Sequence, residues 1–324
     1  MNPLRIVRRL PATPPLAPSA LTIGNLDGVH LGHLAMLEQV KRAAEDLNLC
    51  PSVLTFYPHP RAYFAKLRSA SDSGPAQING LRDKLTRLAQ AGMRQVTLLK
   101  FDVGIANLSA QEFVEQLLVK QLQARWLIVG ADFRFGHRRG GDIDLLEQSA
   151  KKHGFVLKVL SDIGDATGQR ISSSLVRNAL EAGDMPKVAD LMGRPFRVSG
   201  HVIHGKKLGR TLGFPTLNVK VSRQTATRFG IYIVRVHGLA EGPLPGIASL
   251  GLRPTVGVND TVLLETHVLG QSIDAYGKLV SVELLQHVRD EEKFPDLATL
   301  MVAMQRDRQH ALDYFAHHGL QNNA

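Results

Sequence analysis

The chain has 324 residues and a formal net charge of +10, with 44% hydrophobic and 21% charged residues. Its length exceeds the roughly 100 to 200 residues of a typical domain and predicts two domains. The balanced composition excludes a mainly disordered chain, and no apolar run approaches the roughly 20 residues of a membrane span.

The cysteine content and the net charge limit the cellular location and the kinds of partner that are expected. Cys50 has no second cysteine to form an internal disulfide with, and the 13 histidines stand without a cysteine cluster, which favours a reducing, cytoplasmic location without structural zinc. The basic charge favours anionic partners such as phosphorylated metabolites. No long basic tract or nucleic-acid motif accompanies it, so neither a specific nucleic acid nor a membrane is expected as a partner. The sequence carries no signal for the oligomeric state.

Short apolar runs alternate with helical patterns through the first half of the chain. Residues 20–23 predict a strand, followed by a loop and a helix. Further strands are expected at 52–56, 95–99, 126–129 and 156–160, and helices at 81–91 and 110–121. Strands spaced by helices predict a doubly wound parallel sheet. The segment 69–80, with its Ser, Asp, Gly and Pro residues, predicts a mobile surface loop.

After residue 183 the pattern changes to short strand-like runs. They lie at 196–203, 230–236, 246–250, 261–268 and 279–288, and they predict a small β-barrel. Helical spacing at 295–317 predicts a C-terminal helix packed against that barrel. We therefore expect an α/β domain over residues 1–183 and a barrel domain over 184–324.

The motif GNLDGVHLGH, residues 24–33, follows the first predicted strand and opens the first helix. Proteins with α/β folds bind nucleotide phosphates at this place, and glycines such as Gly24 and Gly32 let the backbone approach closely. His30 and His33 can stabilise the charge that develops as pyrophosphate leaves. Two surface histidines at a helix start are the alternative interpretation. For Asp27 a ligand role and a loop-capping role remain equally open.

Four segments of the first half together resemble the bacterial bifunctional riboflavin kinase/FMN adenylyltransferases. They are GNLDGVHLGH (24–33), VLTFYPHP (53–60), VGADFRFG (129–136) and ISSSLVR (171–177). The resemblance covers nearly the whole chain and implies that the first domain transfers an adenylyl group from ATP to FMN. Besides Gly24, Asp27, Gly32 and the two histidines, it assigns four residues to ATP and its developing charge: Asp132, Arg170, Ser173 and Arg177.

The same resemblance assigns four residues to the flavin site of this domain: Phe56, Pro58, Phe133 and Arg134. A Phe at strand spacing is more often an ordinary core residue. The chain departs from the family pattern at Leu26, where Phe is usual, and at Ala131, where a second acidic residue is common. These departures leave open a kinase whose adenylyltransferase domain is inactive.

The motif GKKLGRTLGFPTLN, residues 205–218, joins a glycine-rich loop to basic residues, a combination suited to phosphate binding. It lacks the Walker A spacing and resembles the flavokinase signature of the same family. The resemblance implies that Gly205, Lys207 and Gly213 bind ATP. It also implies that Thr216 and Asn218 bind Mg²⁺, a cation that prefers hard oxygen ligands.

Phosphoryl transfer to the ribityl hydroxyl of riboflavin needs a group that accepts the proton. Glu265 in LETHV, residues 264–268, matches the family's Glu-x-His strand, and strand alternation puts it on one face with His267. Without this match a strand Glu is usually solvent-facing. Arg289, in RDEEKF, resembles a family segment near the flavin, although a solvated charge run is its alternative interpretation.

The resemblance as a whole implies a cytoplasmic enzyme that makes FMN from riboflavin and ATP and then FAD from FMN and ATP, with Mg²⁺ in both steps. Riboflavin, FMN and ATP are its expected small-molecule partners. The net charge of +10 leaves a second alternative, a basic nucleic-acid-binding or regulatory module built on a nucleotide fold.

Overall fold

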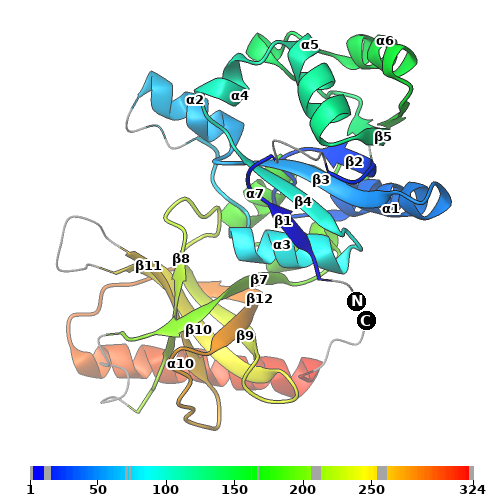
Figure 1. Ribbon diagram of the computed structural model, residues 1–324. Helices are drawn as coiled ribbons and strands as arrows, with labels where there is room; N and C mark the ends of the chain where they lie inside the picture. The colour runs from blue at the N-terminus through cyan, green and yellow to red at the C-terminus, as the bar shows by residue number, and fades with distance from the viewer. Residues whose placement is uncertain are drawn as a thin grey trace. The chain divides into compact units, whose positions relative to one another are not determined.

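The computed structural model describes all residues except 1–2, 11–15, 70–71, 73, 162, 166–167, 206–212, 254–260 and 321–324. The chain divides into two compact units (Figure 1). The first consists of Met1–Pro75 and Lys84–Ser173, and the second of Ala76–Asp83 and Ser174–Ala324. The second unit thus takes a short segment from within the sequence of the first.

A six-stranded, all-parallel sheet forms the centre of the first unit, in the order β1-β4-β3-β2-β5-β6. Its strands are β1 (Arg5–Val7), β2 (Ser19–Ile23), β3 (Cys50–Tyr57), β4 (Gln95–Lys100), β5 (Ala124–Gly130) and β6 (Val156–Leu160). Every residue of β2 is buried, as expected for a central strand covered on both faces. The expected doubly wound parallel sheet is confirmed, although the three-residue β1 was not predicted.

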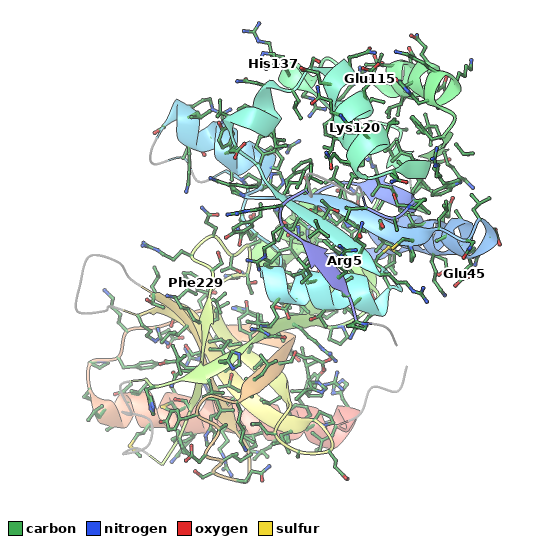
Figure 2. The ribbon with its side chains drawn as sticks, viewed as in Figure 1. Arg5, Glu45, Glu115, Lys120, His137 and Phe229 are labelled. Carbon is green, nitrogen blue, oxygen red and sulfur yellow. The ribbon has the colours of Figure 1, made fainter. Side chains whose placement is uncertain are left out.

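The other elements of this unit are helices. They are α1 (Leu31–Asp46), α2 (Pro60–Arg68), α3 (Leu81–Gln90), α4 (Val103–Asn107), α5 (Ala110–Glu112), the π-helix η1 (Phe113–Gln121), the 3₁₀-helix η2 (His137–Arg139) and α6 (Ile143–His153). The helix expected at 110–121 is therefore one α-helical turn that continues as a π-helix. Leu117 and Leu118 of η1 pack with Leu21 and Leu127 of the sheet in one buried cluster. Glu115 of η1, labelled in Figure 2, accepts a hydrogen bond of 2.8 Å from Lys152 on α6.

The second unit is built on a closed antiparallel barrel with the strand order β10-β11-β8-β7-β12-β9. Its strands are β7 (Phe196–Ile203), β8 (Leu217–Val221), β9 (Gly230–His237), β10 (Leu244–Arg253), β11 (Thr261–Val268) and β12 (Leu279–Arg289). The helices of this unit are α7 (Ser173–Ala182), α8 (Met185–Met192) and α10 (Leu297–His318). Ala311 of α10 packs on Ile233, Ile247 and Leu269, which confirms the expected barrel with a terminal helix.

The segment Ala76–Asp83 belongs to the barrel unit. Gln77 forms a parallel bridge with Thr225, and Asn79 Nδ2 donates to the Arg197 carbonyl at 3.2 Å. Asp83 Oδ2 accepts from the Ser199 amide at 3.2 Å. Residues 76–80, part of the expected surface loop, are therefore hydrogen-bonded into the barrel unit.

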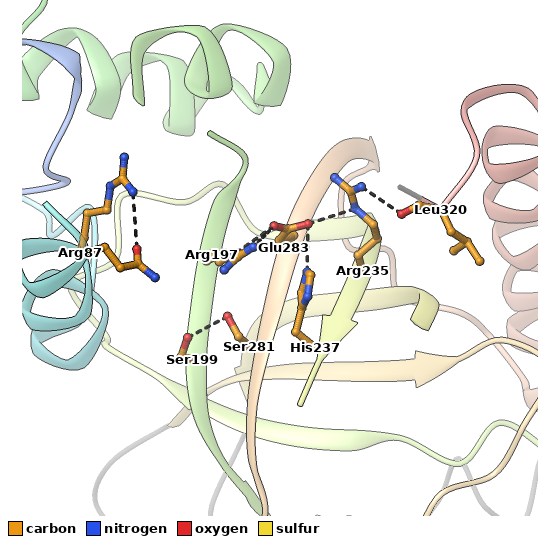
Figure 3. Close-up of polar contacts among 9 residues, drawn as sticks. Arg87, Arg197, Ser199, Arg235, His237, Ser281, Glu283 and Leu320 are labelled. Atoms are coloured by element: carbon orange, nitrogen blue, oxygen red, sulfur yellow. Dashed lines mark hydrogen bonds and ion pairs between the residues drawn. The ribbon is translucent and has the colours of Figure 1, made fainter. Parts of the chain in front are cut away.

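One buried carboxylate joins three strands of the barrel (Figure 3). Glu283 on β12 lies opposite Arg235 on β9 and Arg197 on β7. Its oxygens lie 2.8 Å from Arg197 Nε, 3.0 Å from Arg235 Nε and 3.2 Å from His237 Nε2. Burial alone would raise the pKa of Glu283, but the hydrogen bonds and charges of His237, Arg197 and Arg235 lower it to about 2. Arg235 also donates to the Leu320 carbonyl.

Candidate functional site

The strand order of the first unit reverses between β2 and β5. The chain runs from β2 outward through β3 to β4, and later fills the other side with β5 and β6. Ligands of open α/β sheets bind beyond the carboxyl ends of the strands at this point of reversal. The loop after β2 carries the motif 24–33, and the loop after β5 carries Asp132.

His30 and His33 come together at the start of α1. His30 is the N-cap of the helix, and its ring stacks on that of His33 with centroids 3.7 Å apart. A side chain on Gly32 would approach the His30 ring to 3.3 Å and the Ile171 carbonyl to 3.4 Å, so glycine keeps this corner open. Burial, followed by the charges of His30 and Lys84, holds the pKa of His33 well below its usual value. A neutral His33 can donate one hydrogen bond to a phosphate.

Lys84 on α3 contacts the loop that precedes α1, and the sequence analysis did not predict this contact. Its side chain is buried, and Nζ donates to the Asn25 carbonyl at 2.6 Å and to Thr55 Oγ1 at 3.3 Å. Burial lowers the pKa of Lys84 to about 8, against the opposing effect of Asp27. One feature of the sequence could have indicated that Lys84 is buried. It lies three residues after Leu81 and four before Leu88, within an otherwise apolar stripe of the helix.

The other charged residues that the sequence analysis assigned to ATP lie on further segments of the chain. Arg170 Nη2 donates to Asp132 Oδ2 at 3.0 Å, and both side chains are exposed. Ser173 Oγ donates to the Asp27 carbonyl at 3.1 Å, which joins the segment before α7 to the loop after β2. Asp27 is buried, with 8% of its surface exposed. Arg177 belongs to the second unit, where its Nε donates to the Ala76 carbonyl.

Aromatic rings gather beyond β3. Phe56 contacts Phe101 edge to face at 5.6 Å, and the rings of Tyr63 and Phe64 on α2 pack on Phe101 as well. Pro58 lies in the turn between β3 and α2. The structure thus gives Phe56 an aromatic setting, and Phe56 also packs against the hydrophobic core of the unit.

The other two expected flavin residues of this unit follow β5. Phe133 stacks on Phe135 with centroids 5.6 Å apart. Arg134 Nη1 donates to Asp142 Oδ2 at 3.0 Å, and its side chain is about half exposed. His137, at the start of η2, follows them in the chain (Figure 2).

In the second unit three polar residues form one row across the barrel wall. Asn218 on β8, Glu265 on β11 and Ser249 on β10 are direct cross-strand partners. Directly opposed residues project from the same face of a sheet, so Glu265 lies between an amide and a hydroxyl. Two residues along β11, His267 Nδ1 lies 3.0 Å from the Pro215 carbonyl, in the segment that leads into β8.

An arginine holds the Glu265 carboxylate. Arg253 Nε donates to Glu265 Oε2 at 2.9 Å, while its other nitrogens donate to Glu291 Oε1 at 2.7 Å and to Ser249 Oγ at 2.8 Å. The Glu265 side chain is 28% exposed and can still be reached from solvent. The sequence analysis did not predict this contact between Arg253 and Glu265.

A small cleft lies beside this row and is lined by Gly205, Thr216, Asn218 and Tyr276 among others. Asn218 Oδ1 is buried and has no hydrogen-bond partner among the described residues. A side chain on Gly205 would come within 2.6 Å of the Asn218 amide, so glycine is needed there. Gly213 has a left-handed φ of 79°. Lys207 lies outside the described residues.

Arg289 packs against the terminal helix. Its Nε and Nη2 donate to Asp307 on α10 at 3.0 and 2.6 Å, and its guanidinium lies 5.7 Å from the Phe294 ring.

The described part of the chain contains no cluster of three metal-ligating His, Cys, Asp or Glu side chains. It also contains no helix that is long and apolar enough to cross a bilayer.

Comparison with known proteins gives a family match for each half of the chain. Residues 13–175 match the family described as FAD synthetase, and residues 192–315 match riboflavin kinase. The bifunctional riboflavin kinase/FMN adenylyltransferase of Escherichia coli K12 is 42% identical over 296 residues, which are 91% of this chain and 92% of that protein. The Haemophilus influenzae protein of the same name is 41% identical over 91% of this chain and 94% of its own length. A solved structure from Streptococcus pneumoniae, described as a macrolide-efflux protein, has a TM-score of 0.76 and 26% identity, covering 93% of this chain and 95% of that one.

Proposed function

The chain belongs to the family of bifunctional riboflavin kinases/FMN adenylyltransferases, and on this premise we propose how its two units divide the two reactions. The enzyme phosphorylates riboflavin with ATP to give FMN and ADP, and adenylylates FMN with a second ATP to give FAD and pyrophosphate. The barrel carries the first reaction and the α/β domain the second. We place the boundary between the two catalytic domains between Gly183 and Asp184, after the point at Ser173 where the compact units divide. We place the enzyme in the cytoplasm, as its single cysteine suggests.

In the kinase reaction Glu265 is the proposed base. Its carboxylate accepts the proton of the ribityl hydroxyl as that oxygen attacks the γ-phosphorus of ATP and the bond to the β-phosphate oxygen breaks. Its salt bridge to Arg253 orients the carboxylate in the row with Asn218. Gly205, Lys207 and Gly213 belong to the loop proposed to receive the ATP phosphates, and Arg289 to the segment proposed to border the flavin.

The residues beside Glu265 suit Mg²⁺. The buried Asn218 Oδ1 has no partner among the described residues, and Thr216, two residues earlier, offers a second hard oxygen at the same cleft. When bound there, Mg²⁺ would neutralise phosphate charge. Thr216 and Asn218 are therefore its proposed ligands in the kinase site.

In the adenylyltransferase reaction an oxygen of the FMN phosphate attacks the α-phosphorus of ATP, and pyrophosphate leaves. His30 and His33 are proposed to donate hydrogen bonds to the phosphates as charge moves onto the leaving group. Arg170, Ser173 and Arg177 are the further proposed phosphate ligands.

The remaining residues of this site are assigned to the nucleoside and the flavin. Gly24, Asp27 and Gly32 form the proposed backbone cradle, and Asp132 the proposed partner of the ribose hydroxyls or of Mg²⁺. Phe56, Pro58, Phe133 and Arg134 are proposed to border the flavin. The observation that carries this assignment is the stacked histidine pair at the strand-order reversal, on a loop next to the one that holds Asp132.

Flavin chromatography after incubation with riboflavin, ATP and Mg²⁺ tests the assignment. Wild type is expected to yield FAD. Glu265→Gln should lower kcat for FMN formation by roughly 10²- to 10⁴-fold and leave conversion of added FMN to FAD intact. His33→Gln should do the reverse and accumulate FMN.

Glu241→Gln is the matched control, because Glu241 is an exposed carboxylate of the same barrel unit. It is expected to behave as wild type. A Glu265→Gln enzyme that still makes FMN at the wild-type rate would exclude Glu265 as the base.

A further inference from the structure

Lys84 is a buried cation to which the two reactions above give no role. Its side chain leaves 9% of its surface exposed, and its ammonium binds the Asn25 carbonyl at 2.6 Å. Thr55 Oγ1 donates to the same carbonyl at 3.3 Å and lies 3.3 Å from Lys84 Nζ. Three elements thus meet at one carbonyl: α3, β3 and the loop after β2. Burying an ammonium group costs free energy, so we expect Lys84 to have a role that outweighs this cost.

The loop that Lys84 contacts has an unusual backbone. Leu26, Gly28 and Val29 have φ values of 48°, 80° and 44°. Glycine adopts this left-handed region freely, but leucine and the β-branched valine rarely do. Such a backbone persists when its surroundings hold it in place. The Asn25 carbonyl, directly before Leu26, is where Lys84 and Thr55 hold it.

We propose that Lys84 is a positioning residue of the adenylyltransferase site, whose ammonium fixes the strained loop 25–29 and so places His30 and His33 for the phosphates of ATP. This inference rests on the role proposed above for the two histidines. Lys84 touches neither substrate nor the reacting atoms, and acts through the Asn25 carbonyl.

Charge gives the proposal a second consequence. The titratable groups that act on His33 are His30 and Lys84, and both lower its pKa beside the effect of burial. Asp27 acts on Lys84 and favours its charged form. A charged Lys84 therefore keeps His33 neutral to lower pH, and this effect fades as Lys84 loses its proton near pH 8.

The test compares pH profiles of FMN adenylylation for wild type, Lys84→Met and Lys84→Arg in the full chain. Lys84→Met should lower kcat by about 10²-fold, as expected when catalytic groups lose their placement, and should move the acid limb to higher pH. Lys84→Arg keeps its charge at all accessible pH values and should lose the alkaline limb near pH 8 that wild type is expected to show. Arg82→Met, an exposed cation on the same helix, is the matched control and should follow the wild-type profile.

Riboflavin kinase activity of the same preparations separates positioning from misfolding. A purely structural role would lower kcat without moving either limb. If Lys84→Met adenylylates FMN with the wild-type kcat and acid limb while His33→Gln is impaired, the inference about Lys84 is overturned. The assignment of the histidines would then still hold. Wild-type activity in His33→Gln would instead remove the assignment on which it rests. If Lys84→Met also loses kinase activity, it is misfolded, and the pH profile of Lys84→Arg is the test. An alkaline limb that stays near pH 8 in Lys84→Arg overturns the proposal.

Discussion

At the scale of single residues, the buried charge of Lys84 lowers the stability of the folded protein, while its ammonium positions the loop 25–29. In the folded protein burial lowers its pKa to about 8, from the 10.5 of a lysine in water. Between these two pH values the unfolded chain binds more protons than the folded one, so this residue makes the free energy of unfolding rise with pH across that window. Below pH 8 the folded protein bears the full cost of the buried charge.

Lys84→Met is therefore expected to be more stable than wild type at pH 7, by up to about 3 kcal/mol, while its adenylyltransferase activity falls. The difference should shrink between pH 8 and 10.5 and vanish above, because wild-type Lys84 is then neutral. Denaturant unfolding followed by the fluorescence of Trp126 measures this, since Trp126 is the single tryptophan and lies on β5 of the same unit. A variant less stable than wild type at pH 7 would contradict the argument.

At the scale of elements, Glu283 links β12 to β7 and β9 through three basic side chains. Its pKa is lowered from 4.5 to about 2, so its contribution to stability is fully present above pH 4.5 and is lost as the pH falls toward 2. Glu283→Gln leaves buried positive charge unpaired and should cost roughly 3 kcal/mol at pH 7.

That difference from wild type should fade below pH 4.5, because a protonated Glu283 has no charge to lose. Hydrogen exchange of peptides from β9 and β12 locates the effect in the barrel. Glu241→Gln, exposed in the same unit, should leave exchange unchanged. A destabilisation of equal size at pH 3 and pH 7 would show that the charge of Glu283 is not its cause.

Patterns of the same scale explain what could be predicted. The strands at 156–160, 196–203 and 261–268 were placed to the residue, because apolar β-branched runs bounded by turn residues are local signals. β8 was missed because its first two residues are the last two of the glycine-rich motif, so the phosphate-binding signal obscured the start of the strand. Lys84 could not be assigned, since its partners come from β3 and the loop after β2, and no local pattern shows such contacts.

At the scale of the whole molecule, two sites in two compact units should fail independently. A mixture of full-length Glu265→Gln and His33→Gln is expected to make FAD from riboflavin, because FMN released by one variant can be adenylylated by the other. FAD should appear after a lag that shortens as protein concentration rises, whereas each variant alone makes little. Chromatography of timed samples measures this. A mixture that accumulates FMN without FAD, although Glu265→Gln converts added FMN, would mean that released FMN does not reach the second site.

The discontinuous second unit also bears on the order in which the protein is made. Asn79 and the strand residue Arg197, to whose carbonyl it donates, are 118 residues apart. At a synthesis rate of about 5 to 20 residues per second, residues 76–83 wait roughly 6 to 24 seconds before β7 exists. During that time the growing chain can complete the parallel sheet while it carries a tethered piece of the later barrel. Residues 76–83 are therefore made before the barrel residues that they contact, and a gene split at residue 183 would separate them from the barrel.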